Sequence, residues 1–277
     1  MTKLISSRSL FALFAVLGAS AAACSGGATE AVDQASQALS DDGQTAVDAN
    51  EQSSGALADA AFEAATADPA AAVEAMLAAA PPAVDGKCRS RAKDPSDPHT
   101  VIVTLTDCTG RFGKHRVSGT EIVHFTKGVE GVLHADFHSE GLTFDGRPAN
   151  HTASADVTFA NGARQVSWTG AFDTATAGGL AVTHTSTLTI EVDPATHCRT
   201  RDGSAVTTVG DRRIHSTITS LTVCRAADGD ATCPIGTVTH TNEVSGKTVT
   251  VAFDGSAEAT ITTPKGATIE RPLTCRE

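Results

Sequence analysis

The sequence predicts an all-β protein, an antiparallel meander of about eleven or twelve strands that forms a curved sheet or a partly closed barrel, preceded by short Ala-rich helices. From residue 100 onward, apolar residues alternate with Thr and other polar residues, which is typical of half-buried antiparallel strands. Gly-containing pairs separate successive runs at the spacing of hairpin turns, and no helical pattern lies between them.

The clearest strand covers residues 100–107, where Val101, Val103 and Leu105 share one face and Thr104 lies on the other. The same alternation recurs in four later runs, at Val157 and Phe159, at Val166, Trp168 and Phe172, at Leu188, Ile190 and Val192, and at Val249, Val251 and Phe253. The turn pairs that separate the strands are Asn161-Gly162, Gly178-Gly179, Gly210-Asp211, Asp228-Gly229, Gly255-Ser256 and Lys265-Gly266.

One hairpin has a register that the sequence itself supports. A two-residue turn at Asn161-Gly162 places Val157 opposite Val166 and Ala155 opposite Trp168. Both pairs are apolar, so this register puts apolar side chains together on one face of the sheet.

One strand departs from strict alternation. Ile214 and Ile218 share one parity, whereas Leu221 and Val223 have the other. This change of phase predicts a β-bulge at about Thr219-Ser220, or a strand that is buried on both faces in turn.

The N-terminus carries an export signal. Lys3 and Arg8 precede an apolar run over residues 10–17, and small residues end it at Ala21-Ala22-Ala23-Cys24. This segment, residues 1–24, resembles the precursor of a bacterial lipoprotein. The resemblance implies that Cys24 is diacylated and becomes the mature N-terminus, and Ser25 after it is similar to the residue that directs such proteins to the outer membrane. The alternative is an ordinary A-x-A cleavage site at which Cys24 is incidental.

The chain divides into four segments. Residues 1–23 are the predicted signal peptide, residues 24–53 an acidic disordered tether, residues 54–86 an Ala-rich helical segment, and residues 87–277 a disulfide-stapled antiparallel β domain. Residues 25–86 contain eleven acidic residues and no Lys or Arg, so most of the net charge of −11 belongs there. In the helical segment, Asp68-Pro69 is expected to cap a helix that Pro81-Pro82 ends.

Cysteine parity favours lipidation and three disulfides. The chain has seven cysteines, and lipidation of Cys24 leaves an even set of six: Cys88, Cys108, Cys198, Cys224, Cys233 and Cys275. Cys88 and Cys108 are symmetric about Pro98, so a hairpin there joins them. For the rest, we slightly prefer Cys224–Cys233 with Cys198–Cys275, and the rival set is Cys198–Cys224 with Cys233–Cys275.

One cluster could bind a metal ion. His134, Asp136 and His138 share one face of a strand, and a turn around Val129 would bring His124 opposite His134. Four nitrogen and oxygen ligands on one face could hold zinc or a similar ion. The alternative is a solvated strand face in a chain with ten His residues.

The sequence predicts where the protein is located and how it folds, but it contains no motif that predicts a specific biochemical activity. We expect a lipid-anchored cell-envelope lipoprotein that is not an enzyme, with a structural or binding β domain and no cofactor. Its expected partners are the membrane, through the lipid, and an unidentified protein or lipid; the nearly neutral β domain argues against nucleic acid. The alternatives are a lipid or lipoprotein carrier with an apolar groove, by analogy of fold alone, and a metal-binding protein.

Overall fold

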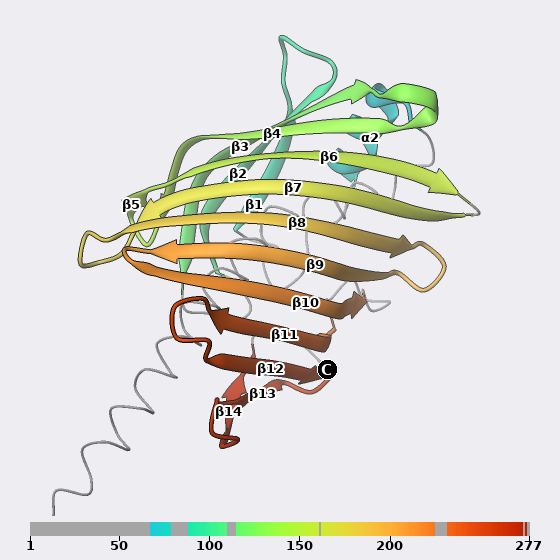
Figure 1. Ribbon diagram of the computed structural model, residues 1–277. Helices are drawn as coiled ribbons and strands as arrows, with labels where there is room; N and C mark the ends of the chain where they lie inside the picture. The colour runs from blue at the N-terminus through green and yellow to red at the C-terminus, as the bar shows by residue number, and fades with distance from the viewer. Residues whose placement is uncertain are drawn as a thin grey trace, which may run out of the picture.

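The computed structural model describes residues 67–78, 88–109, 115–160, 162–224, 232–273 and 275 (Figure 1). Within these ranges the chain forms one α-helix, one short 3-10 helix and fourteen strands. In chain order they are α2 (Pro69–Ala78), β1 (Arg89–Lys93), β2 (Thr100–Thr109), β3 (Arg116–Lys127), η1 (Val129–Gly131), β4 (Leu133–Phe144), β5 (Arg147–Pro148), β6 (Asn150–Ala160), β7 (Ala163–Ala175), β8 (Ala181–Asp193), β9 (Cys198–Val209), β10 (Arg212–Cys224), β11 (Ile235–Asn242), β12 (Thr248–Asp254), β13 (Glu258–Thr262) and β14 (Thr268–Pro272).

All fourteen strands belong to one antiparallel sheet, and the prediction of an all-β curved sheet is confirmed. Each strand pairs with the next along the chain, except that β4 also pairs with β6 and β5 lies beside the path. The sheet is open, because β1 and β14 are its two edges. It curves so that the first strands lie behind the central ones in Figure 1. The structure has more strands than predicted, and the shortest of them, β5, has only two residues, too few to show alternation.

The predicted hairpin register is confirmed. β6 and β7 pair Val157 with Val166 and Ala155 with Trp168. All four side chains lie on the face with buried alternate residues, which we call the inner face. On β8 every second residue from Val182 to Val192 is buried, and the Thr and acidic residues between them are exposed. We call that exposed side the outer face.

The predicted bulge is also present. The pairing of β10 with β9 shifts by one residue between Ile218 and Leu221. Ser220 lies in the shift with φ of 48°, and its N–H donates to Asp202 Oδ1 at 2.8 Å. The extra residue explains the sequence pattern, because Ile218 and Leu221 both remain on the inner face although their parity differs.

The helix α2 covers the inner face at the first strands. It begins at Pro69, and Asp68 Oδ1 accepts a hydrogen bond from Ala71 N at 2.8 Å, so the predicted N-cap is confirmed. Its buried residues Val73 and Met76 join the core of β1, β2 and β3. The predicted end at Pro81-Pro82 lies outside the described residues.

All six cysteines of the β domain form disulfides, and one predicted pair is confirmed: Cys88 bonds Cys108. The preferred pairing of Cys224 with Cys233 and Cys198 with Cys275 is wrong; Cys198 bonds Cys224, and Cys233 bonds Cys275. Thr232 explains the error, because its N–H donates to Cys224 O at 2.8 Å and it takes the place opposite Cys224. Cys233, one residue further, points to the opposite face and is buried.

Candidate functional site

The predicted metal cluster lies on the outer face of β3 and β4. His134, Asp136 and His138 share that face, as predicted from their spacing. The predicted register is wrong, because His124 lies opposite Asp136 and His134 lies opposite Thr126. The turn contains η1 and is centred one residue later than predicted, which moves every partner by two positions.

His134 is held between two carboxylates. Its Nδ1 lies 2.7 Å from Asp156 Oδ1 on β6, and its Nε2 lies 3.3 Å from Asp136 Oδ1. The hydrogen bond to Asp156 is the main cause of a raised pKa of His134, and Asp136 adds to it. Two carboxylates favour an imidazolium that donates from both nitrogens, whereas a metal ligand needs a nitrogen lone pair.

His124 has partners of its own. Its Nδ1 lies 2.9 Å from both Thr100 Oγ1 and Asp97 Oδ2, in the β1–β2 turn. Among the described residues, no group of three His, Cys, Asp or Glu side chains is arranged to hold a metal ion. The structure therefore joins His134 to Asp136 and Asp156, and directs the Nδ1 of His124 elsewhere.

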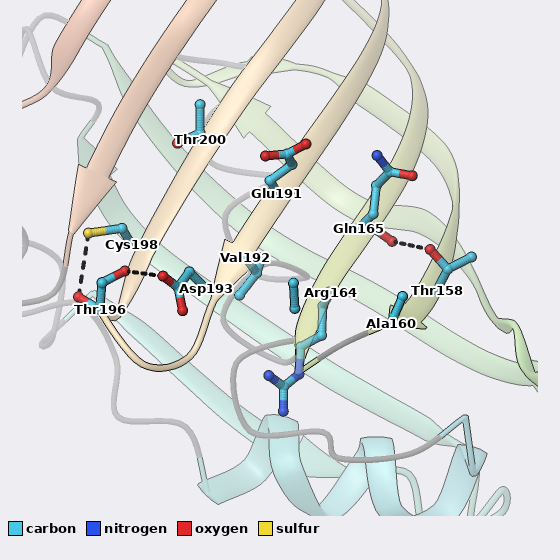
Figure 2. Close-up of a pocket in the computed structure, with 11 residues that line it drawn as sticks. Thr158, Ala160, Arg164, Gln165, Glu191, Val192, Asp193, Thr196, Cys198 and Thr200 are labelled. Carbon is cyan, nitrogen blue, oxygen red and sulfur yellow. Dashed lines mark hydrogen bonds between the residues drawn. The ribbon is translucent and has the colours of Figure 1, made fainter.

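A depression of about 570 Å³ lies on the outer face at one end of β6–β9 (Figure 2). Thr158, Gln165, Glu191 and Thr200 form one row across its floor, as register partners on four neighbouring strands. Asp193 at its rim accepts hydrogen bonds from Ala195 N and Thr196 Oγ1, each at 2.8 Å, and the bond from Thr196 is the main cause of its lowered pKa. This carboxylate closes the β8–β9 turn. The lining of this depression is mixed, because Ala160, Ala163 and Val192 contribute to it beside the polar groups, and Asp193 and Thr196 belong to the turn.

The inner face is mostly apolar. Along β7 and β8 it presents Val166, Trp168, Leu188 and Ile190, each no more than 2 % exposed. These residues belong to one continuous core that extends from α2 to β13. In the described part of the chain, α2 contacts β1–β3, and the central strands contact mainly their neighbours in the sheet. The central inner face of this open, curved sheet is thus broad and apolar, and its side chains are almost fully buried.

Polar side chains are also buried on this face; two pairs join neighbouring strands, and a third, between β3 and β6, spans β4. His151 Nδ1 lies 3.1 Å from Glu121 Oε1, His184 Nδ1 lies 2.9 Å from Thr207 Oγ1, and His240 Nδ1 lies 2.8 Å from Ser216 Oγ. Burial lowers the pKa of His184 to about 4, with a smaller effect from His151, and burial lowers that of His240 to about 4. Both imidazoles are therefore neutral at pH 7. Arg201 is buried on the same face of β9.

The sequence alone does not single out His184 and His240, because both lie in strands rich in Thr. A signal was present, because His184 has the parity of Leu188 and Ile190 and so belongs to the apolar face. Because His is polar and a strand rich in Thr tolerates it on either face, the residue type alone does not predict that His184 is buried.

The disulfides indicate the cellular compartment in which the protein folds. Three disulfides indicate an oxidising compartment, which for this chain means export. No described helix combines the length and apolar composition needed to cross a membrane. The predicted signal segment and Cys24 lie outside the described residues.

No protein-family model, curated protein or solved structure matches this chain.

Proposed function

We propose that this chain is an exported lipoprotein, anchored to the outer membrane through Cys24, whose non-catalytic β domain binds an apolar ligand on its inner face. The observation that carries the proposal is the apolar inner face of an open sheet. A concave surface of apolar side chains with a few placed polar groups is the usual form of a site for a small hydrophobic molecule.

Cysteine parity supports the anchor. The three disulfides use six of the seven cysteines, which leaves Cys24. It follows three small residues at the end of an apolar segment, the arrangement that resembles a lipoprotein precursor. The acidic residues after it would keep the β domain away from an anionic membrane surface by repulsion.

The placement of the outer-face polar groups supports binding over catalysis. His134 is engaged by two carboxylates, and Asp193 is engaged by its own turn. These contacts account for both groups as parts of the sheet surface and its turns. A carrier of lipids or lipoproteins is one form of this function, in which the ligand is passed to a second membrane.

Titration of the purified chain with N-phenyl-1-naphthylamine, an apolar probe that fluoresces when it is bound, tests the proposal. We expect saturable binding at about one site per chain. Ala205→Leu adds volume to the inner face and should weaken binding, whereas Val206→Leu, the neighbouring position on the outer face, should not. Binding that does not saturate, or that both variants reduce equally, would contradict the proposal.

A further inference from the structure

A row of small side chains crosses the inner face of five central strands. Ala153, Gly170, Ser186, Ala205 and Ser216 are successive register partners from β6 to β10, and we call them the small-residue row. Neighbouring strands lie about 4.8 Å apart, so the row extends for about 19 Å. Larger side chains border it on both sides, including Trp168 and Leu188 on one and Phe172 and His184 on the other.

The indole of Trp168 points into this row. A Cβ atom placed on Gly170 would lie 2.8 Å from Trp168 Nε1, so the indole N–H occupies the space above Gly170. Trp168 is 1 % exposed, and its Nε1 has no hydrogen-bond partner among the residues that the structure describes. A buried N–H without an acceptor is unfavourable, because it has lost its water and gained nothing in return.

A second unpartnered nitrogen lies on the other border of the row. His184 is 4 % exposed, and within the described part of the chain its Nε2 has no hydrogen-bond partner. Its Nδ1 lies 2.9 Å from Thr207 Oγ1, and when that hydroxyl donates, Nε2 carries the ring hydrogen and is a donor. His184 is the diagonal neighbour of Gly170 across β7 and β8, at about 7–8 Å between Cα atoms. The two donors therefore flank the same part of the row.

The surrounding side chains hold the indole in place. Phe137 meets Trp168 edge-on with ring centroids 5.1 Å apart, and His151 stacks against it at 6.2 Å. Further along the row, Ser216 lies between Ile214 and Ile218, which are buried. The donors thus lie beside Gly170 and Ser186, and the row continues past Ala205 to Ser216, which Ile214 and Ile218 border.

We propose that the small-residue row binds an acyl chain whose carboxyl oxygen accepts hydrogen bonds from Trp168 Nε1 and His184 Nε2. The hydrocarbon lies along Ala205 toward Ile214 and Ile218. This inference rests on the proposed function, since it names the ligand class and the polar contacts of the same inner face. An acceptor head with an apolar tail satisfies both nitrogens and places the hydrocarbon beside the apolar residues that border the row at Ser216.

The experiment compares two ligands with identical hydrocarbon chains, dodecanoate and dodecyltrimethylammonium, below their micelle concentrations. Only dodecanoate has a hydrogen-bond acceptor. Trp168 is the only Trp and the chain has no Tyr, so its emission reports directly on the site. We expect dodecanoate to change this emission saturably and to bind about tenfold more tightly, the effect of one to two net hydrogen bonds.

Variants locate the head group. By calorimetry, His184→Phe and Trp168→Phe should each weaken dodecanoate binding about tenfold and leave the ammonium ligand unchanged. His240→Phe is the matched control, because His240 is a buried inner-face histidine whose Nδ1 is paired with Ser216. If His184→Phe does not fold, His184→Gln replaces it, with folding checked by circular dichroism.

The two proposals fail differently. If neither ligand binds, both the proposed function and this inference are wrong. If both ligands bind with equal affinity and the His184 and Trp168 variants change nothing, the face binds apolar molecules but the assignment of the head group is wrong. An equal loss with His240→Phe would also overturn the assignment, because the effect would then be general.

Discussion

Cys224 lies opposite Cys198 because β10 contains one more residue than β9 requires. Before the bulge, Ile218 pairs with Gly203, and after it, Leu221 pairs with Arg201. If the register before the bulge continued without a shift, Cys224 would face position 197 and its side chain could not meet Cys198. The bulge therefore sets the disulfide as well as the face on which Leu221 lies.

The first prediction concerns Gly203, which pairs with Ile218 just before this bulge and lies against β8 on its other side. Gly203 has φ of 146°, and a Cβ on it would overlap with Thr187 O, a backbone atom that cannot move easily. Gly203→Ala should lower the free energy of unfolding by about 2 kcal/mol or more, from steric overlap and backbone strain.

Gly246→Ala is the control for this variant. Gly246 also has positive φ, of 64°, but nothing lies within 4 Å of the position that a Cβ would take there. The substitution should therefore cost only the backbone strain. Urea unfolding of both variants measures the difference, and equal losses would show that the contact at Gly203 is unimportant.

The second prediction concerns buried histidines. The pKa of His184 and that of His240 are each lowered from 6.5 to about 4, so the unfolded chain binds protons that the folded chain excludes. Stability is therefore complete above pH 6.5 and falls as the pH falls toward 4. At about pH 5 each histidine should reduce the free energy of unfolding by about 2 kcal/mol.

Urea unfolding at pH 7 and pH 5 tests whether the free energy of unfolding falls as the pH falls. His240→Asn should lose less stability between these pH values than the unaltered chain does, by about 2 kcal/mol. The carboxylates that titrate in the same range are common to both proteins and cancel in the comparison. An identical loss would mean that His240 is protonated in the folded chain.

The third prediction concerns His134, whose contribution to stability should change with pH in the opposite direction to that of His184 and His240. Asp156, with help from Asp136, raises the pKa of His134 above 6.5. Its contribution is therefore complete below pH 6.5 and is lost as the pH rises through the higher folded pKa. The effect should be small, because the group lies at the surface where solvent screens it.

NMR titration of the imidazole gives the most direct measurement. Asp156→Asn should lower the pKa of His134 more than Asp136→Asn does, since Asp156 is the larger cause. A change of equal size in both variants, or none, would contradict the arrangement of this cluster.

Most of the architecture follows from local pattern. Val157 with Val166 and Ala155 with Trp168 are predicted correctly because period two and a two-residue turn determine them together. The phase change between Ile218 and Leu221 predicts the bulge for the same reason. Such features depend on neighbours in the sequence.

Other features depend on longer-range register. The partner of Cys224 could not be settled, because one inserted residue at Ser220 decides whether it meets Cys198. The partner of His124 was wrong because η1 moves the β3–β4 pairing by two positions. The unpartnered nitrogens of Trp168 and His184 depend on side-chain packing that alternation does not encode.

The fourth prediction concerns the anchor. Replacing Cys24 with Ala should move the protein from the membrane fraction to the soluble fraction and leave the three disulfides intact. The signal segment and the parity of the cysteines support this result. Fractionation followed by immunoblotting measures it, with Ser25→Ala as the neighbouring control. A Cys24→Ala protein that stays with membranes would contradict a lipid anchor.

The last prediction is that the disulfides limit the stability of the β domain. From residue 87 onward the chain has only seven Phe, one Trp and no Tyr, so few large side chains fill the core. Folded domains have a net stability of about 5–15 kcal/mol, and each disulfide contributes roughly 2–4 kcal/mol. Three disulfides together are then comparable with the whole margin.

Calorimetry with and without a reductant measures this contribution. Reduction should unfold the β domain or lower its melting temperature by tens of degrees, because about 6–12 kcal/mol of stabilisation is lost. The Cys233–Cys275 disulfide closes the longest loop, with a separation of 42 residues, so its double Ser variant should show the largest single loss. If reduction lowers the melting temperature by only a few degrees, the packing of the inner face is sufficient without the disulfides.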